Sequence, residues 1–182
     1  MSRLALRAIA VAGVIALLGA VSFAVAGGGT KNFKGDPMLG YEENPDISTV
    51  ATGAFEGRLS DDGTTLAYEL SYSGLEGTVQ QAHIHFGKRG VNGGVSIWLC
   101  GTAGFVPPTA GIPTCPQEGT VSGAVDMTDV VGPAGQGIAA GEFAEILAAM
   151  RAGHAYANVH STKFPGGEIR AQLNDGGEGG DN

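Results

Sequence analysis

The sequence predicts a mainly β protein, an antiparallel β-sandwich of about seven strands with one short helix near residues 142–152. Three observations carry this prediction. Short segments in which apolar and polar residues alternate recur along the chain. Turn-forming segments, which hold many of the 32 glycines, separate them. A single segment has the period of an amphipathic helix.

The first two strands are expected at residues 50–59 and 64–73. The second segment alternates cleanly, with Leu66, Tyr68, Leu70 and Tyr72 on one side. Asp61-Asp62-Gly63 between the segments is a turn signal. The two strands are therefore expected to form a hairpin.

The middle of the chain adds three strands and the helix. The strands are expected at residues 79–86, 95–99 and 120–127. The period then changes, and one helical stripe is formed by Phe143, Ile146, Leu147 and Met150. Gly153, directly after this segment, is typical of a helix end.

The last part of the expected domain, residues 155–173, divides with period two into two strands around a turn at residues 162–166. One face of the pair is polar and consists of Tyr156, Asn158, His160, Glu168, Arg170 and Gln172. The other face is apolar. If Ser161 pairs with Gly167, the facing polar pairs are His160–Glu168, Asn158–Arg170 and Tyr156–Gln172. A slip of one residue would turn the apolar residues outward, so any chemistry is expected on the polar face.

Both ends of the chain are expected to lie outside this domain. Residues 1–26 carry two arginines, an apolar run and the small-residue pattern Ala24-Val25-Ala26, which together are typical of a secretory signal peptide. An uncleaved membrane anchor stays open as an alternative, because the apolar run is nearly long enough to cross a bilayer. A flexible lead-in and a disordered acidic, Gly-rich tail are expected at residues 27–37 and 174–182. The protein is thus expected to be secreted, in an extracellular or periplasmic compartment.

The formal net charge of −8 bears on the class of partner. Nucleic acids and anionic membrane surfaces attract basic patches, so an acidic chain argues against both. The expected partner is an unknown protein or a small ligand, with no membrane contact after cleavage of the leader.

Cys100 and Cys115 are the two cysteines of the chain, and both lie in the exported part. Such a pair in an oxidising compartment is expected to form a disulfide. The enclosed segment is rich in Gly and Pro, which favours a cross-linked surface loop. The spacing matches no zinc motif.

The histidines form a second candidate feature. His83 and His85 stand at positions i and i+2 of an expected strand, so they share a face, and His160 lies on the polar face of the last strand pair. Three imidazoles on polar strand faces are candidate ligands for Cu or Zn. Glu168, opposite His160 in the expected register, is a candidate fourth ligand or second-shell acceptor. His154 has the right parity but stands at the helix exit, and is the weakest candidate.

A purely structural role for the same residues stays open. The histidines can form a hydrogen-bonded network with Tyr156, Asn158, Arg170 and Gln172 that satisfies buried polar groups and fixes the register. Arg170 also weighs against a metal, because its guanidinium competes for Glu168 and repels a cation.

Two segments of the chain resemble a known family. AHIHFGKRGVNGGV, followed by AGHAYANVHSTKFPGGEIRAQL, is similar to the CHRD (chordin) domain, and the resemblance extends over residues 38–173. Ser161 and Ala171 depart from the Thr and Gly common in the family. The resemblance implies an exported β-sandwich-like module, immunoglobulin-like or Cu/Zn superoxide dismutase-like, and implies no catalytic activity.

Three functions follow as hypotheses. The first is a non-catalytic binding or structural module, with no catalytic residue expected. The second is a Cu- or Zn-binding protein that uses His83, His85 and His160. The third is a superoxide dismutase-like oxidoreductase. The number of histidines disfavours it, since a dinuclear site needs about six and the chain has 4.

Overall fold

The structure is a computed structural model that describes residues 31–173. The expected signal peptide and acidic tail lie outside these residues. Within them the chain forms one α-helix, α1 (Phe143–Arg151), and eight strands. The strands are β1 (Asn32–Leu39), β2 (Thr52–Leu59), β3 (Leu66–Ser73), β4 (Val79–Phe86), β5 (Gly94–Gly101), β6 (Gly119–Val125), β7 (Ala155–Ser161) and β8 (Ile169–Gln172). Three short 3-10 helices cover Gly40–Glu42, Met127–Asp129 and Ala134–Gln136.

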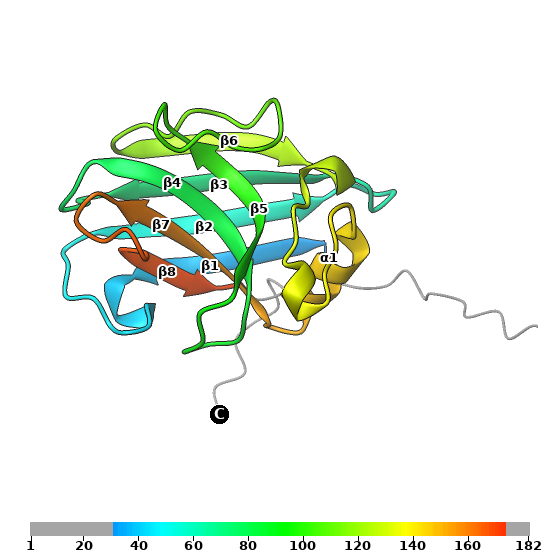
Figure 1. Ribbon diagram of the computed structural model, residues 1–182, viewed down its shortest axis with the longest axis horizontal. Coiled ribbons are helices and arrows are strands. Elements are labelled where there is room, and N and C mark those ends of the chain that lie inside the picture. Colours follow the sequence, from blue (N-terminus) through cyan, green and yellow to red (C-terminus); the bar gives the residue numbers. More distant parts are fainter. Residues whose placement is uncertain (1–30, 174–182) are drawn as a thin grey trace, which may run out of the picture.

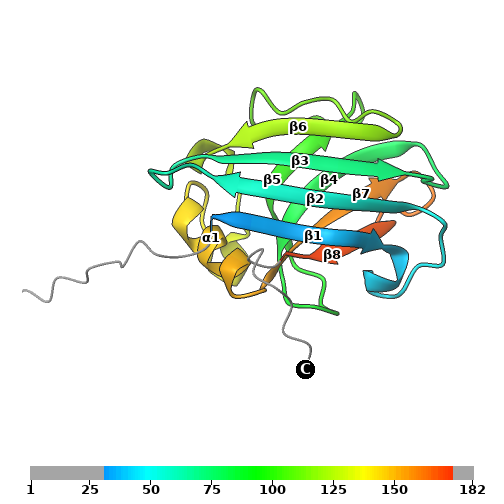
Figure 2. The ribbon, with the colours of Figure 1, turned by 180° about the vertical axis from the view of Figure 1, so that it is seen from behind.

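The eight strands form one antiparallel sheet in the order β5-β4-β7-β8-β1-β2-β3-β6. The sheet folds over into two layers and nearly closes into a barrel (Figure 1). One layer contains β1, β2, β3 and β6, and the other contains β4, β5, β7 and β8 (Figure 2). The predicted class is confirmed as mainly β and antiparallel with one short helix. Two details of the prediction need correction: there are eight strands instead of about seven, and one sheet instead of a two-sheet sandwich.

Strand β1 explains both corrections. It begins inside the segment expected to be a flexible lead-in, where Lys34, Gly35 and Pro37 obscure the alternation. Phe33 and Met38 are nevertheless fully buried, and the pairing with β2 shifts register between Gly35 and Met38. Pro37 lacks an N–H, which suits such an irregularity. Leu39 at the end of β1 pairs with Arg170 of β8, and this contact joins the two layers into one sheet.

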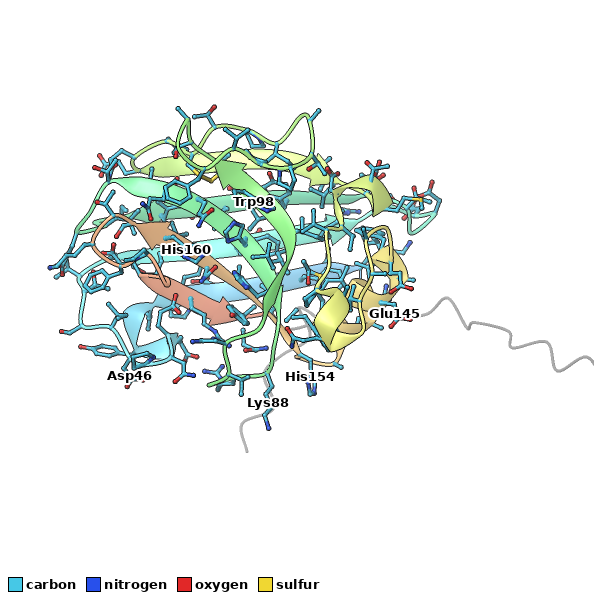
Figure 3. The ribbon with its side chains drawn as sticks, viewed as in Figure 1. Asp46, Lys88, Trp98, Glu145, His154 and His160 are labelled. Atoms are coloured by element: carbon cyan, nitrogen blue, oxygen red, sulfur yellow. A yellow bond between two sulfur atoms is a disulfide. The ribbon has the colours of Figure 1, made fainter. Side chains whose placement is uncertain are left out.

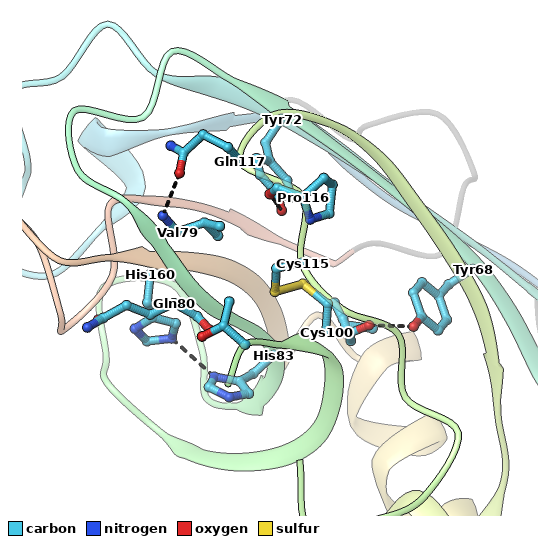
Figure 4. Close-up of a disulfide and its surroundings, with 12 residues drawn as sticks. Tyr68, Tyr72, Val79, Gln80, His83, Cys100, Cys115, Pro116, Gln117 and His160 are labelled. Carbon is cyan, nitrogen blue, oxygen red and sulfur yellow. Dashed lines mark hydrogen bonds between the residues drawn. A yellow bond between two sulfur atoms is a disulfide. The ribbon is translucent and has the colours of Figure 1, made fainter. Parts of the chain in front are cut away.

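The remaining opening of the barrel lies between the end strands β5 and β6. Ile97 of β5 forms an isolated bridge with Val130, which follows β6. The predicted disulfide is present, since Cys100 at the end of β5 is bonded to Cys115 in the loop before β6 (Figure 4). Tyr68 of β3 donates a hydrogen bond across the core to the carbonyl oxygen of Leu99, at 2.5 Å. These contacts hold the two end strands close together.

The hairpin, the helix and the last strand pair follow the sequence prediction. Strands β2 and β3 pair throughout from Thr52–Ser73 to Leu59–Leu66. Helix α1 covers one end of the barrel (Figure 1) and buries Phe143, Ile146, Leu147, Ala149 and Met150. Strands β7 and β8 pair in the predicted register, with Tyr156 opposite Gln172 and Asn158 opposite Arg170.

Candidate metal centre

The polar face predicted for the last strand pair is buried. Strand β4 lies next to β7 in the sheet, so the face extends from β8 across β7 to β4. All seven residues of β7 are buried, whichever way they point. Val159 and its alternate neighbours belong to the hydrophobic core, while Asn158 and His160 face away from it. The loops that follow β4 and β7 supply backbone carbonyl oxygens to this second face, and the loop that follows β1 supplies the buried Glu43 side chain.

The three predicted histidines meet on this face. In the pairing of β4 with β7, His83 lies opposite Asn158 and His85 opposite Tyr156, while His160 lies opposite Gln81. Ile84, between the two β4 histidines, points into the core and is fully buried. Figure 4 shows the His83 and His160 rings directed toward one another. One ligand nitrogen from each of the three histidines lies within 4.8 Å of the others.

Hydrogen bonds to the backbone define the orientation of two of the rings. Nδ1 of His85 lies 2.9 Å from the carbonyl oxygen of Gly93, and Nδ1 of His160 lies 3.0 Å from that of Pro165. Because a carbonyl oxygen only accepts, both Nδ1 atoms carry the proton and both Nε2 atoms keep a lone pair. This backbone support at Nδ1 is the arrangement found around metal-ligating histidines.

His83 completes the network. Its Nδ1 lies 3.1 Å from Nε2 of His160. Since that Nε2 is an acceptor, His83 donates from Nδ1 and its own Nε2 is left with a lone pair. The Nε2 atoms of His83 and His85 are buried and have no hydrogen-bond partner within residues 31–173. Two buried acceptors without a donor are costly unless something binds them.

Burial keeps the three imidazoles neutral. It lowers the pKa of His83 far below its usual range, and His160 and His85 lower it further by charge repulsion. Burial also lowers the pKa of His85, to about 4, against the hydrogen bond that His85 donates to the carbonyl oxygen of Gly93, which raises it. The pKa of His160 is lowered by burial as well. Neutral imidazoles are the form that binds a metal, so no proton has to be displaced at neutral pH.

Aromatic rings enclose the histidines. The Trp98 ring meets the His83 ring edge-on, with centroids 4.3 Å apart. Tyr156 stacks on His85 at 4.8 Å and at an angle of 2°. The guanidinium carbon of Arg170 lies 3.3 Å from the centroid of the same tyrosine ring, and Arg170 donates to the carbonyl oxygen of Lys88. His154, by contrast, is exposed at the edge of the molecule, away from His160 and Trp98 (Figure 3).

Glu168 is not brought to the imidazoles. Its carboxylate is fully buried and accepts hydrogen bonds from the Thr49 hydroxyl at 2.9 Å, from the backbone N–H of Glu76 at 2.7 Å and from the Ser161 hydroxyl. Strand β8 begins one residue later, at Ile169, so the strand alternation that predicted the His160–Glu168 pair does not reach Glu168. Glu168 therefore connects three backbone segments, and it is not a member of the histidine cluster.

Gln172 has a comparable structural role at the other end of the polar face. Its Nε2 lies 2.8 Å from each of the carbonyl oxygens of Gly87, Gly153 and Ala155. It thereby connects the start of the loop after β4 to the segment between α1 and β7.

Glu43 is the buried ionisable residue of this face that the sequence did not reveal. Burial raises its pKa to about 7, although the nearby Arg170 charge and a hydrogen bond from Asn158 lower it. Its Oε1 has no hydrogen-bond partner within the described residues. A Cβ atom on Gly167 would lie 2.4 Å from this oxygen, so the glycine is what allows Glu43 to approach. Glu43 stands in an irregular loop without periodicity, and no pattern distinguishes it from Glu42.

The fold and the site together define a small, mainly β domain with a disulfide near the opening of the barrel and a buried three-histidine cluster on its polar face. The CHRD domain family matches residues 37–173, and the chain belongs to this family. Neither the curated proteins nor the solved structures contain a significant match.

Two observations bear on the compartment. The Cys100–Cys115 disulfide indicates an oxidising environment. Among residues 31–173, no helix has the length and apolar character needed to cross a membrane.

Proposed function

We propose that this CHRD domain is an exported, non-catalytic metal-binding module that holds one Cu or Zn ion with His83, His85 and His160. The convergence of three buried, neutral imidazoles carries the proposal. Three nitrogens that bind one ion at about 2.1 Å in trigonal or tetrahedral geometry are about 3.4–3.6 Å apart. Ligand atoms that lie within 4.8 Å of one another therefore need to approach by about 1 Å, which rotation of the rings can supply.

The unpartnered nitrogens favour metal binding over a self-sufficient polar network. A network that served only to connect strands would pair its own donors and acceptors, as Glu168 does with both of its oxygens. The histidine cluster leaves Nε2 of His83 and of His85 without a donor within the described residues. A bound cation would engage these two lone pairs on β4, and it would be joined to β7 when Nε2 of His160 gives up its hydrogen bond with His83 to bind the ion.

The test is a metal titration of protein purified without a His-tag and stripped with a chelator. Trp98 is the sole tryptophan of the sequence and contacts His83, so its fluorescence reports on the cluster directly. We expect binding of one equivalent of Cu or Zn and a rise in melting temperature. Free metal at about 100 times Kd should stabilise the fold by about 2.7 kcal/mol.

The matched variants are His85→Ala and His154→Ala, which remove a buried and an exposed histidine. The first should abolish metal-dependent stabilisation and the second should leave it unchanged. Sub-stoichiometric metal together with an unshifted melting temperature in the unmodified protein would refute the proposal, and would leave the polar face as a structural connection between strands.

The non-catalytic part of the proposal has its own support. Ser161 follows His160 directly, but its hydroxyl donates to Glu168 on the opposite side of the strand, so the two do not form a nucleophile–base pair. A superoxide dismutase-like oxidoreductase is the weaker candidate, since the chain has too few histidines for a dinuclear site. It stays a candidate because a single copper ion could still cycle between oxidation states. Loss of superoxide in the presence of the copper-loaded protein, above that of free copper, would support that candidate.

A further inference from the structure

The charges around the histidine cluster bear on which ion it binds. Three neutral imidazoles contribute no negative charge. Glu168, the fully buried carboxylate nearby in sequence, has both oxygens engaged by Thr49, Ser161 and the backbone of Glu76. Tyr156 is not a source of negative charge either, because burial raises the pKa of its phenol.

The buried ionisable side chains nearest the cluster on this face are Arg170 and Glu43, and because burial raises the pKa of Glu43 to about 7, its carboxyl only partly offsets the guanidinium at neutral pH. Arg170 is 1% exposed and stacks on Tyr156, the same ring that stacks on His85. A guanidinium stays protonated in proteins, so Arg170 is a fixed positive charge separated from His85 by the Tyr156 ring. It repels any cation bound at His85.

We propose that the cluster selects monovalent copper, Cu(I), over divalent Cu or Zn. This proposal rests on the proposed metal-binding function and specifies which ion the site binds. The cost of transferring an ion into a low-dielectric site grows with the square of its charge, and a site without anionic ligands does not compensate a second charge. Repulsion by Arg170 likewise doubles for a divalent ion.

The number of protein ligands points the same way. Imidazole binds copper well, although sulfur ligands are the usual ones that select Cu(I). Cu(I) has a filled d shell and is stable with three ligands. Zinc in proteins is almost always four-coordinate, so a three-histidine site needs an added water or hydroxide. The three histidines are 2–7% exposed and enclosed by the rings of Trp98 and Tyr156, which offer no further anionic ligand.

The experiment compares three ions on the same tag-free protein by competition with chelators of known affinity. Cu(I) is titrated without oxygen, and Cu(II) and Zn(II) are titrated at the same pH. We expect Kd for Cu(I) to be at least about 100-fold lower than for either divalent ion. For copper this preference raises the reduction potential of the bound couple by about 120 mV over the free couple, which voltammetry measures independently.

A substitution that adds a negative charge at the site tests whether the missing charge causes the selectivity. Asn158→Asp places a carboxylate on the histidine face with almost no change of shape, since Asn158 lies opposite His83 in the pairing of β4 with β7. It should reduce the Cu(I) preference by at least about tenfold. The control Asn32→Asp adds the same charge on the exposed start of β1 and should leave the preference unchanged.

The outcomes separate the two proposals. Zn(II) or Cu(II) bound as tightly as Cu(I) would overturn the selectivity and leave the metal site intact. Binding of none of the three ions would overturn the metal site itself. If Asn158→Asp folds and keeps the full preference, the charge argument is wrong. If that variant does not fold, the comparison of ions on the unmodified protein decides.

Discussion

Gly167 offers the sharpest test of the buried polar face. An added Cβ would lie 2.4 Å from Oε1 of Glu43 and 2.8 Å from Nδ2 of Asn158, well inside contact distance. The backbone φ of Gly167 is 131°, a conformation that L side chains rarely adopt. Such a backbone costs about 1–3 kcal/mol, and overpacking a buried site costs about 1–3 kcal/mol more. Gly167→Ala should therefore lower the free energy of unfolding by about 2–6 kcal/mol, measured by urea denaturation.

The neighbouring Gly166 supplies the control, because nothing lies within 4 Å of a Cβ built there and its φ is not positive. Gly166→Ala should change stability by less than about 0.5 kcal/mol. Glu43→Ala combined with Gly167→Ala should restore about 1–2 kcal/mol relative to the sum of the single variants, since the clash disappears and the backbone strain remains. If Gly166→Ala and Gly167→Ala turned out equally stable, this would show that Glu43 does not pack against the turn.

Three further predictions concern pH, Glu168 and the disulfide. As pH falls below about 6.5 the unfolded chain protonates its histidines while the buried ones resist, so stability should drop toward pH 4. The contribution of Glu43 to the pH dependence of stability has the opposite sign. Its pKa is raised to about 7, so the folded state keeps a proton that the unfolded state has already lost, and this contribution to stability grows as pH falls. Glu43→Gln should thus steepen the pH dependence by about 1 kcal/mol per pH unit between about pH 5 and 6, and an unchanged slope in urea titrations would contradict this. Glu168→Ala should cost on the order of 3 kcal/mol or more, because the Thr49 and Ser161 hydroxyls and the Glu76 N–H lose a buried charged acceptor, whereas a thermal melt of the exposed-site control Glu56→Ala should barely shift. Replacing Cys100 and Cys115 by serine should cost about 3 kcal/mol for a 15-residue separation, and a loss below about 1 kcal/mol would show that the Ile97–Val130 bridge holds the opening alone.

The features that the sequence predicted are those governed by local period and parity. Alternation predicted the β7–β8 register, since a one-residue slip would turn Val159 and Ile169 from the core onto the polar face. The same parity placed His83 and His85 on one face, and the shared polar character linked them to His160. Spacing within the AHIH segment was therefore enough to predict the members of the cluster.

The features that it did not predict depend on long-range pairing or on irregular backbone. Strand β1 forms because β2 and β8 are available on either side of it, and its own sequence shows little alternation. Glu168 departs from the strand pattern because β8 begins one residue later. Glu43 is buried by loops that meet only in the folded chain, so its position follows from the fold and not from a motif.

The polar groups that hold the histidine face are mostly main-chain carbonyl oxygens, from Gly87, Lys88, Gly93 and Pro165. A carbonyl oxygen is present whatever side chain a residue has. Substitutions at these loop positions therefore preserve the acceptor as long as the backbone path is kept. Inserting or deleting one residue would displace every acceptor in the loop at once. This centre should thus tolerate changes in the composition of the loops after β4 and β7 and be intolerant of changes in their length.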